Sequence, residues 1–498
     1  MINAVEMIGV SKRFGDVQAL DSVDLRVGTG TIHAVVGENG AGKTTLMRIL
    51  YGALHPDAGS ISIEGSLVAP KSSAQAIALG VGMVSQHYGI IPELSCLQNL
   101  ILGTEGDAIL HMSAARNRAE QLAQKMGFQF DWDRSASELS PAGAQKLEIL
   151  KLLWRNSRIM ILDEPTAMLS PVDGEALFQS LRLLVAEGNT VILVTHRLPE
   201  VFGHCSHVTV LRGGKLVADK PVSETNPGEL AELIVGKRLE EPSLHQYQPG
   251  QSVLTLRNFQ VVGARGNLAV KGIDFEIREG DVVGIAGVDG SGQRELFHAL
   301  LGTISIYGGD ATFLGSSLNS MSKWDRLAAG LSAIPEDRHS EGVIEDWSLE
   351  ENSALGLQRL SPFAKGNQVD ELGRRQATAA IAERFDTKHG GIAEPISDLS
   401  GGNQQRFVAA RALYRSPKLI LAFQPARGLD LAATQEVHEA IRSQCLQGAA
   451  ALVVSYDLDE LLDHSDRIVV MNRGELFNPP PGDERDPMVI GRLMVAAE

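Results

Sequence analysis

The 498-residue sequence predicts an α/β protein built from two similar tandem domains, each with a mainly parallel sheet at its core. Three observations support this prediction. Short apolar runs suited to strands alternate with longer runs suited to helices. The chain also repeats itself: Gln293 follows Lys43 by 250 residues (293 − 43), and Leu399 follows Leu139 by 260 residues (399 − 139). Finally, a glycine-rich loop lies between a strand-like and a helix-like run in each copy.

The repeat divides the chain into a first domain at residues 1–240 and a second at residues 252–498. Residues 241–251 between them are polar and contain two prolines, so we expect a short linker. Ten extra residues are expected in the second copy between its residues 336 and 399, because the offset grows from 250 to 260. The main elements that we expect are strands at 31–36, 159–162, 281–285 and 419–422 and helices at 113–126 and 369–385.

Composition bounds the class of protein. Hydrophobic residues make up 44% and charged residues 21%, as in a globular protein with a full core. The formal net charge of −16 argues against a surface that binds nucleic acid. Cys96, Cys205 and Cys445 are scattered, which indicates a reducing compartment. We expect no secretory signal and no membrane span, so any transport function would need a pore from another subunit.

A glycine-rich loop in the first copy carries a phosphate-binding pattern. Residues 37–44 read GENGAGKT, which fits G-x-x-x-x-G-K-[ST]. Glycines let backbone N–H groups turn toward a phosphate, and the helix N-terminus adds its positive dipole end. We expect Lys43 to reach the β- and γ-phosphates and the Thr44 hydroxyl to bind Mg²⁺. The residues expected at the nucleotide are Gly37, Glu38, Asn39, Gly40, Ala41, Gly42, Lys43, Thr44 and Thr45.

Two further strand ends in the first copy carry polar residues. The run 159–162 ends in Asp163 and Glu164, and the run 191–194 is followed by Thr195 and His196. Ligands of open α/β sheets bind at the carboxyl ends of the strands. We therefore expect Asp163 to hold Mg²⁺ and Glu164 to orient and deprotonate the attacking water. His196 is expected near the γ-phosphate, although a single histidine is also compatible with a structural role.

The order of these motifs resembles that of ATP-binding cassette (ABC) ATPases over essentially the whole chain, twice. The resemblance implies two P-loop NTPase domains, each with a mainly parallel α/β core, an antiparallel β subdomain and a helical subdomain. In this family an aromatic residue stacks on adenine; Phe14 occupies that place, with ordinary packing as the alternative. The resemblance assigns Gln86 to a loop that senses Mg²⁺ and the γ-phosphate beside the membrane subunit. The implied ligands are ATP and Mg²⁺, the implied catalytic residues are Lys43, Gln86, Glu164 and His196, and the implied metal ligands are Thr44, Gln86 and Asp163.

The second copy lacks the residues that this chemistry requires. The replacements are Gln293 for Lys43, Arg294 for Thr44, Phe423 for Asp163, Gln424 for Glu164, Tyr456 for His196 and Ala264 for Phe14. They remove a cation, the metal ligands, the general base and the aromatic partner of adenine. All of these losses fall on one nucleotide-facing surface.

The segment known in this family as the signature shows the opposite distribution. Residues 399–405 read LSGGNQQ, whereas residues 139–145 read LSPAGAQ, with Pro141 and Ala142 in place of the two glycines Gly401 and Gly402. Cassettes of this family pair head to tail, so each nucleotide lies between one phosphate loop and the other copy's signature. In such a pair, all the replacements in this chain fall on one of the two sites, whereas two copies that had lost residues independently would have replacements at both. The resemblance therefore implies one degenerate site and one complete site, the latter using Ser400, Gly401, Gly402, Asn403 and Asp430 of the second copy.

Within the family, the chain looks like the ATPase subunits of bacterial importers for simple sugars and nucleosides. Residues 85–88 (SQHY) and 423–430 (FQPARGLD) are closer to the nucleoside branch than to the ribose branch. This implies two permease subunits and, through them, an extracytoplasmic solute-binding protein. It also implies a peripheral position on the cytoplasmic face of the cell membrane, with membrane contact only through the permease and no nucleic acid partner. The alternatives are a soluble twin-cassette ATPase, such as a ribosome-associated translation factor, and a regulatory module that binds nucleotide without hydrolysis.

One histidine–cysteine cluster is a weak candidate for a metal site. Residues 204–207 read HCSH, but the matching residues 464–467 of the second copy read HSDR. We therefore expect a structural loop before an apolar strand rather than a zinc site.

Overall fold

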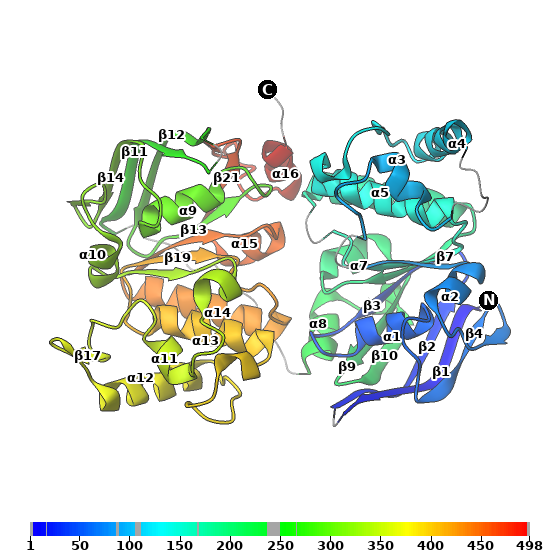
Figure 1. Cartoon of the computed structure of the whole chain (residues 1–498), viewed down its shortest axis with the longest axis horizontal. Helices are drawn as coiled ribbons and strands as arrows, with labels where there is room; N and C mark the ends of the chain where they lie inside the picture. The colour runs from blue at the N-terminus through cyan, green and yellow to red at the C-terminus, as the bar shows by residue number, and fades with distance from the viewer. Residues whose placement is uncertain are drawn as a thin grey trace. The chain divides into compact units, whose positions relative to one another are not determined.

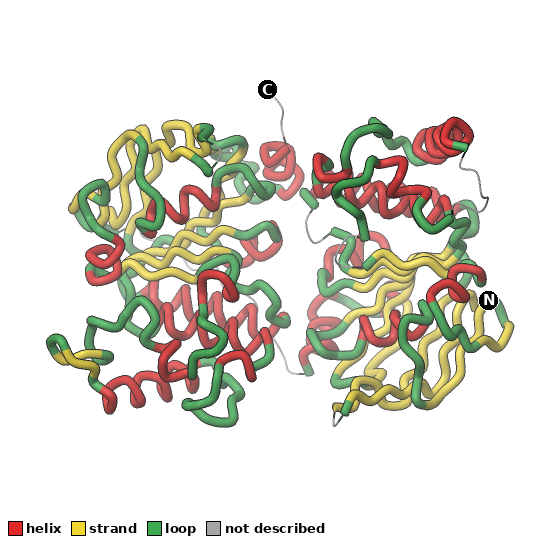
Figure 2. Tube along the Cα trace, in the orientation of Figure 1, coloured by secondary structure: helices red, strands yellow, loops and turns green. Residues whose placement is uncertain are grey.

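A computed structural model describes residues 3–15, 17–85, 89–104, 111–166, 169–236, 250–264 and 266–495. The chain folds as two compact units, Met1–Glu240 and Glu241–Glu498. Both units are α/β, which confirms the predicted fold class (Figures 1 and 2). Residues 241–249 of the expected linker lie outside the described residues.

The first unit contains a six-stranded sheet in the order β10-β9-β3-β8-β7-β6. All neighbouring pairs are parallel except β9 and β10, which are antiparallel. Every residue of β3, β7 and β8 is buried, as expected for parallel strands covered on both faces. The strands are β3 (Ile32–Val36), β6 (Val81–Val84), β7 (Ile159–Asp163), β8 (Thr190–Val194), β9 (His207–Arg212) and β10 (Lys215–Pro221).

The two faces of this sheet pack against different layers, because successive side chains of a strand point to opposite sides. Met160 and Leu162 of β7 belong to the core shared with helices α3, α4 and α5. Ile159 and Ile161 belong to the core shared with α1 and a second, antiparallel sheet of order β2-β1-β4-β5. Figure 1 shows the helices α3 to α5 and the strands β1, β2 and β4 on opposite sides of the central sheet. These strands are β1 (Asn3–Phe14), β2 (Val17–Gly28), β4 (Ala58–Ile63) and β5 (Ser66–Val68).

The helices of the first unit follow the predicted alternation with strands. The helix expected at residues 113–126 is α4 (Met112–Lys125). Among the described residues of the whole chain, none of the helices has both the length and the apolar character needed to cross a bilayer. The other helices of this unit are α1 (Lys43–Leu50), α2 (Ser73–Ala78), α3 (Cys96–Ile101), α5 (Pro141–Trp154), α6 (Pro171–Ala186), α7 (Leu198–His204) and α8 (Pro227–Val235).

The second unit repeats this architecture with a sheet of order β16-β19-β20-β13-β21-β22 and a smaller antiparallel sheet of order β12-β11-β14-β15. The six strands of its large sheet are β13 (Val282–Ala286), β16 (Leu331–Ile334), β19 (Leu419–Phe423), β20 (Ala450–Val454), β21 (Arg467–Asn472) and β22 (Glu475–Phe477). The smaller sheet contains β11 (Ser252–Val262), β12 (Leu268–Arg278), β14 (Gly308–Phe313) and β15 (Ser316–Ser317). The main helices are α9 (Gln293–Leu301), α10 (Lys323–Ala328), α11 (Leu349–Ser353), α12 (Glu371–Arg384), α13 (Gly401–Leu413), α14 (Leu431–Leu446), α15 (Leu458–His464) and α16 (Pro487–Val495).

The helix expected at residues 369–385 begins two residues later than predicted. Val369 belongs to a short hairpin of β17 (Ala364–Lys365) and β18 (Gln368–Val369). Asp370 then caps α12, because its Oδ1 accepts a hydrogen bond from the Gly373 N–H at 3.1 Å. This hairpin lies in the segment where the second copy has ten extra residues.

Candidate active site

The glycine loop of the first unit connects β3 to α1 and is shaped by three glycines with positive φ. The angles are +155° at Gly37, +82° at Gly40 and +99° at Gly42. A Cβ atom would lie 2.2 Å from the Leu211 carbonyl oxygen at Gly37 and 2.6 Å from the Ala19 carbonyl oxygen at Gly42. Both positions require glycine, because these obstacles are backbone atoms. The loop ends at the N-terminus of α1, where N–H groups and the helix dipole favour an anion.

Lys43, the first residue of α1, reaches back into this loop. Its Nζ donates hydrogen bonds to the carbonyl oxygens of Gly37 at 2.6 Å and Glu38 at 3.0 Å, and the residue is 7% exposed. Burial lowers the pKa of Lys43, and the charges of Glu164, Asp163 and Glu38 oppose this shift. The loop thus holds a cation where it would enclose a phosphate.

Thr44 and Asp163 bring two oxygen ligands together beside the loop. The Thr44 hydroxyl donates a hydrogen bond to Asp163 Oδ2 at 3.2 Å, although the residues are far apart in sequence. Burial and the Glu164 charge raise the pKa of Asp163, while the Thr44 hydrogen bond and the Lys43 charge lower it in part. A hydroxyl and a carboxylate are oxygen ligands of the kind that Mg²⁺ prefers, so these two residues fit the ion. Gln86, the third predicted metal ligand, lies outside the described residues.

Glu164 and His196 form a pair at the ends of neighbouring strands. Glu164 Oε1 lies 2.9 Å from His196 Nδ1, and an ionised carboxylate only accepts, so the ring nitrogen donates. Burial alone would raise the pKa of Glu164, but the hydrogen bond from His196 and the charges of His196 and Lys43 outweigh it, so the pKa is lowered. The carboxylate is therefore ionised at neutral pH, as a general base must be.

The other predicted residues of the first unit lie at the end of β1 and in the glycine loop. Phe14 ends β1 with 46% of its surface exposed, and Lys12 Nζ lies 5.7 Å from the centroid of its ring. Phe14 is therefore not a buried core residue, as a residue that stacks on a ligand must not be. Asn39 is exposed and Ala41 buried within the glycine loop, and Thr45 follows in the first turn of α1.

The second unit preserves the shape of the loop but not its chemistry. Gly287, Gly290 and Gly292 have φ values of +157°, +84° and +108°, close to those of the first loop. The Gln293 Nε2 donates to the Val288 carbonyl oxygen at 3.2 Å, from a residue only 1% exposed. A neutral amide therefore fills the place where the first loop holds its ammonium group.

The other replaced positions of the second unit interact with one another. Arg294 forms an ion pair with Glu336 at 2.7 Å, and the Tyr456 hydroxyl donates to Asp289 at 2.9 Å. The Phe423 ring, at the strand end where the first unit has a carboxylate, lies 5.9 Å from the Tyr456 ring. Arg294 and Tyr456 thus already have partners among neighbouring side chains, and no carboxylate replaces Asp163.

Comparison with known proteins identifies the family. A family model described as ABC transporter matches residues 20–167 and 270–426, once in each unit. The chain belongs to the ABC transporter family. Each unit is therefore an ABC cassette, and the chain is an ATPase of the type coupled to transport.

Several relatives match the chain over nearly its full length. It is 35% identical to the nucleoside import ATP-binding protein NupA of Lactococcus lactis, over 99% of this chain and 98% of the relative. It is 34% identical to the guanosine import ATP-binding protein NupO of Bacillus subtilis (99% and 97%) and 37% identical to the glucose import ATP-binding protein TsgD13 of Haloferax volcanii (98% and 95%). A solved structure of the ADP conformation of MJ1267, an ATP-binding cassette of an ABC transporter, matches 48% of this chain and 100% of its own length at 24% identity, with a TM-score of 0.43.

The signature of the second cassette begins helix α13. Ser400 caps this helix, and its Oγ accepts hydrogen bonds from the Asn403 backbone N–H at 3.4 Å and from the Asn403 side chain at 3.0 Å. Gly401 and Gly402 form the first turn of α13. Asp430 caps α14 in the same way, accepting from the Ala433 N–H at 2.8 Å. These residues therefore have local structural roles in addition to the role that the family resemblance implies.

A buried polar cluster behind the Glu164–His196 pair was not among the predicted site residues. Glu200 of α7 accepts hydrogen bonds from the hydroxyls of Thr166 and Thr195, and all three residues are at most 6% exposed. The sequence contained one signal for it, an acidic residue four positions after His196 on a short helix. That signal has meaning only when the fold shows that the carboxylate points inward.

The histidine–cysteine cluster at residues 204–207 has structural partners. The His204 ring stacks on Phe178 with centroids 3.9 Å apart, and the His207 ring stacks on His33 at 5.5 Å. Within the described ranges, no group of three or more histidine, cysteine, aspartate or glutamate side chains is arranged to hold a metal ion.

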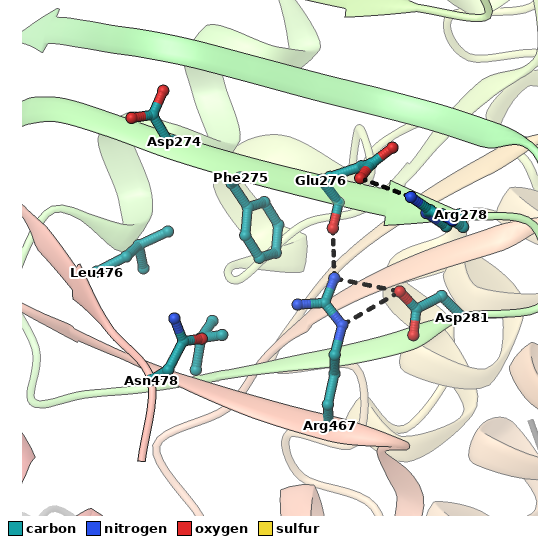
Figure 3. A pocket seen from close by; sticks show the side chains of 9 residues that line it. Asp274, Phe275, Glu276, Arg278, Asp281, Arg467, Leu476 and Asn478 are labelled. Atoms are coloured by element: carbon teal, nitrogen blue, oxygen red, sulfur yellow. Dashed lines mark hydrogen bonds and ion pairs between the residues drawn. The ribbon is translucent and has the colours of Figure 1, made fainter. Parts of the chain in front are cut away.

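A cavity of about 350 Å³ in the second cassette lies apart from the phosphate loop (Figure 3). Asp281 and Arg467 lie at the starts of the parallel strands β13 and β21, whereas the loop follows the carboxyl end of β13. Arg467 donates to Asp281 Oδ2 at 3.2 Å and to the Glu276 carbonyl oxygen, and its guanidinium lies 5.2 Å from the Phe275 ring centroid. These contacts hold the antiparallel sheet against the central one, so the cavity is not part of the candidate active site.

Proposed function

We propose that this chain is the ATP-binding and ATP-hydrolysing subunit of an importer for nucleosides or simple sugars. The named relatives import nucleosides, guanosine or glucose, and they align with both cassettes. The observation that carries the proposal is the convergence of Lys43, Asp163 and Glu164 at one edge of the central sheet. These relatives favour an importer over a ribosome-associated factor.

Hydrolysis would require only positioning and charge from the protein. Lys43 donates hydrogen bonds to the β- and γ-phosphates, while Glu164 accepts a proton from the attacking water. The water oxygen bonds to the γ-phosphorus as the bond to the ADP oxygen breaks, and ADP and phosphate leave. His196 keeps the carboxylate of Glu164 in place through the 2.9 Å contact with Nδ1. Thr44 and Asp163 would hold Mg²⁺, which when bound neutralises charge on the phosphate oxygens.

The other residues of the proposed site would bind the adenine ring, the phosphates and the metal. The exposed ring of Phe14 is proposed to stack on adenine, and the N–H groups of the loop 37–42 to donate to the phosphates. Gln86 is proposed from the family resemblance to join the metal and the γ-phosphate to the loop that meets the permease. Its position lies outside the described residues.

We further propose that hydrolysis occurs at one composite site, where the motifs of the first cassette meet the signature of the second. The support is that the first cassette has the acidic pair and the lysine, whereas the second has the glycines of the signature. Arg294, paired with Glu336, and the Phe423 ring stand where the first cassette has its metal ligands Thr44 and Asp163, and Gln424 stands in place of the base. These replacements support a second site that does not hydrolyse ATP.

The proposed partners are two membrane permease subunits and, through them, an extracytoplasmic solute-binding protein. The chain would then lie on the cytoplasmic face of the cell membrane as a peripheral subunit. ATP binding would close the cassettes and drive the permease, and hydrolysis would reopen them.

Reconstitution with cognate permease subunits tests this function. The chain should sediment with membranes only when the permease is present, and ATP hydrolysis should rise when a solute-binding protein loaded with a nucleoside or a pentose is added. Sedimentation with ribosomes, or ATPase activity that no loaded binding protein changes, would contradict the proposal. Comparing nucleosides with pentoses then determines the class of solute.

A further inference from the structure

Glu200 is a buried carboxylate that connects the two loops carrying Glu164 and His196. One carboxylate oxygen accepts a hydrogen bond from the Thr166 hydroxyl, and the other accepts one from the Thr195 hydroxyl at 2.7 Å. Thr166 follows Glu164 by two residues, and Thr195 immediately precedes His196. A single side chain therefore ties both loops to helix α7.

Helix α7 holds this carboxylate in place from the other side. The Glu200 backbone N–H donates to the Arg197 carbonyl oxygen at 3.2 Å, and the Arg197 guanidinium lies 3.5 Å from the carboxylate. The Thr195 hydroxyl also accepts from the Arg197 N–H at 3.0 Å, so it bridges the loop and the helix start. Burial raises the pKa of Glu200, while the Arg197 charge and the two threonine hydrogen bonds lower it in part. Each of these contacts restricts the rotation of the carboxyl group, so together they hold it in place.

The second cassette provides an internal comparison, because it retains the carboxylate but not this connection. Glu460 accepts from Ser455 at 2.5 Å, in the positions of Glu200 and Thr195. Ala426 stands where the first cassette has Thr166 and has no hydroxyl to donate. The other oxygen of Glu460 instead lies 2.6 Å from His438. The connection to the loop after β19 is thus absent in the cassette that lacks the acidic pair.

The missing connection does not alter the backbone at the strand end. Gln424 has a φ of +51°, against +50° for Glu164, and both backbone N–H groups donate to a neighbouring strand at 2.8 Å. The turn therefore forms without a threonine at this position. The Thr166–Glu200 hydrogen bond is thus present in the cassette that has the predicted catalytic residues, and the fold of the loop does not depend on it.

We propose that Glu200 is a positioning residue for ATP hydrolysis that holds Glu164 and His196 at a constant separation through Thr166 and Thr195. The inference rests on the proposed role of Glu164 and His196 in hydrolysis. Glu200 itself touches neither the water nor the nucleotide. Its contribution would be to keep the Glu164 carboxylate in position when the nucleotide binds, because a small displacement of a general base lowers the rate of hydrolysis strongly.

The test compares Thr166→Ala, which copies the second cassette, with Thr166→Ser, which restores the hydroxyl, in the full-length chain. Thr166→Ala should lower kcat for ATP by ~10-fold with little change in KM, and Thr166→Ser should recover most of the rate. Glu200→Gln should act in the same direction as Thr166→Ala. Glu460→Gln is the matched control in the second cassette and should leave kcat unchanged.

A measurement without nucleotide separates positioning from other causes. Amide hydrogen exchange should become faster at residues 164–166 and 195–197 in Thr166→Ala, while the Tm stays close to that of the parent protein. Unchanged kcat and unchanged exchange in both Thr166→Ala and Glu200→Gln would overturn the inference. Glu164→Gln is measured in parallel. If that variant hydrolyses ATP normally, the proposed role of Glu164 itself is wrong. If Glu164→Gln is inactive but Thr166→Ala is fully active, only the role of Glu200 is rejected.

Discussion

Glu164→Gln should abolish ATP hydrolysis and leave ATP binding intact. The amide oxygen of glutamine can still accept the hydrogen bond that His196 donates over 2.9 Å, so the geometry of the pair is retained. What is lost is the negative charge that accepts a proton from water. General base catalysis contributes roughly 10²- to 10⁴-fold to rate, which corresponds to about 3 to 5 kcal/mol of transition-state stabilisation.

The same substitution should leave the affinity for ATP unchanged or increase it. The Glu164 charge acts on Lys43 inside the glycine loop, and Asp163 lies next to it in the chain. Removing one of these negative charges reduces repulsion of the phosphates. The Kd for ATP should therefore stay the same or fall, which equilibrium binding of a fluorescent or radiolabelled nucleotide measures alongside phosphate release.

The second cassette supplies a control at the matching position. Gln424 has nearly the same backbone φ as Glu164, so Gln424→Glu places a carboxylate in an equivalent turn. Its ATPase rate should change by less than about twofold, because Gln293 and Phe423 still lack the cation and the metal ligand. Normal turnover by Glu164→Gln, or a clear gain from Gln424→Glu, would refute the assignment of the base and of the inactive loop.

Three other changes have defined outcomes. Lys43→Gln should lose most ATP binding with little change in Tm, since Gln293 fits the equivalent loop; calorimetry would reject this if the affinity persisted. Ser400→Ala and Ser140→Ala each remove a helix cap, which should cost about 1 kcal/mol of stability. Only Ser400→Ala should lower ATPase activity, and equal activities of the two variants would argue against the composite site. Burial lowers the pKa of His33 to about 3, so the unfolded state binds the extra proton below pH 6.5 and stability falls as pH drops. In urea, the free energy of unfolding of the parent protein should fall by about 2 kcal/mol more than that of His33→Gln between pH 7 and pH 5, and a difference between the two proteins that does not change with pH would contradict this.

Much of the candidate site could be predicted from sequence, because the residues of each motif lie close together in the chain. The glycine loop requires glycines at fixed spacing, since Gly37 and Gly42 meet backbone atoms where a Cβ would be. The acidic pair follows a run of buried residues, so its place at a strand end could be predicted from the apolar pattern. The start of α12 was predicted too early, because Val369 continues the apolar pattern but pairs in a hairpin before the Asp370 cap.

The sequence by itself determined the tandem repeat, the shape of each glycine loop and the absence of a lysine and an acidic pair from the second copy. Each of these depends on which residues occupy a few adjacent positions. Only the tertiary structure decided that Glu200 joins Thr166 to Thr195 and that Arg294 pairs with Glu336. Thr166 and Glu200, and likewise Arg294 and Glu336, are distant in sequence and meet because the parallel strands of one sheet end at the same edge. No local pattern in the sequence indicates which side chains will meet there.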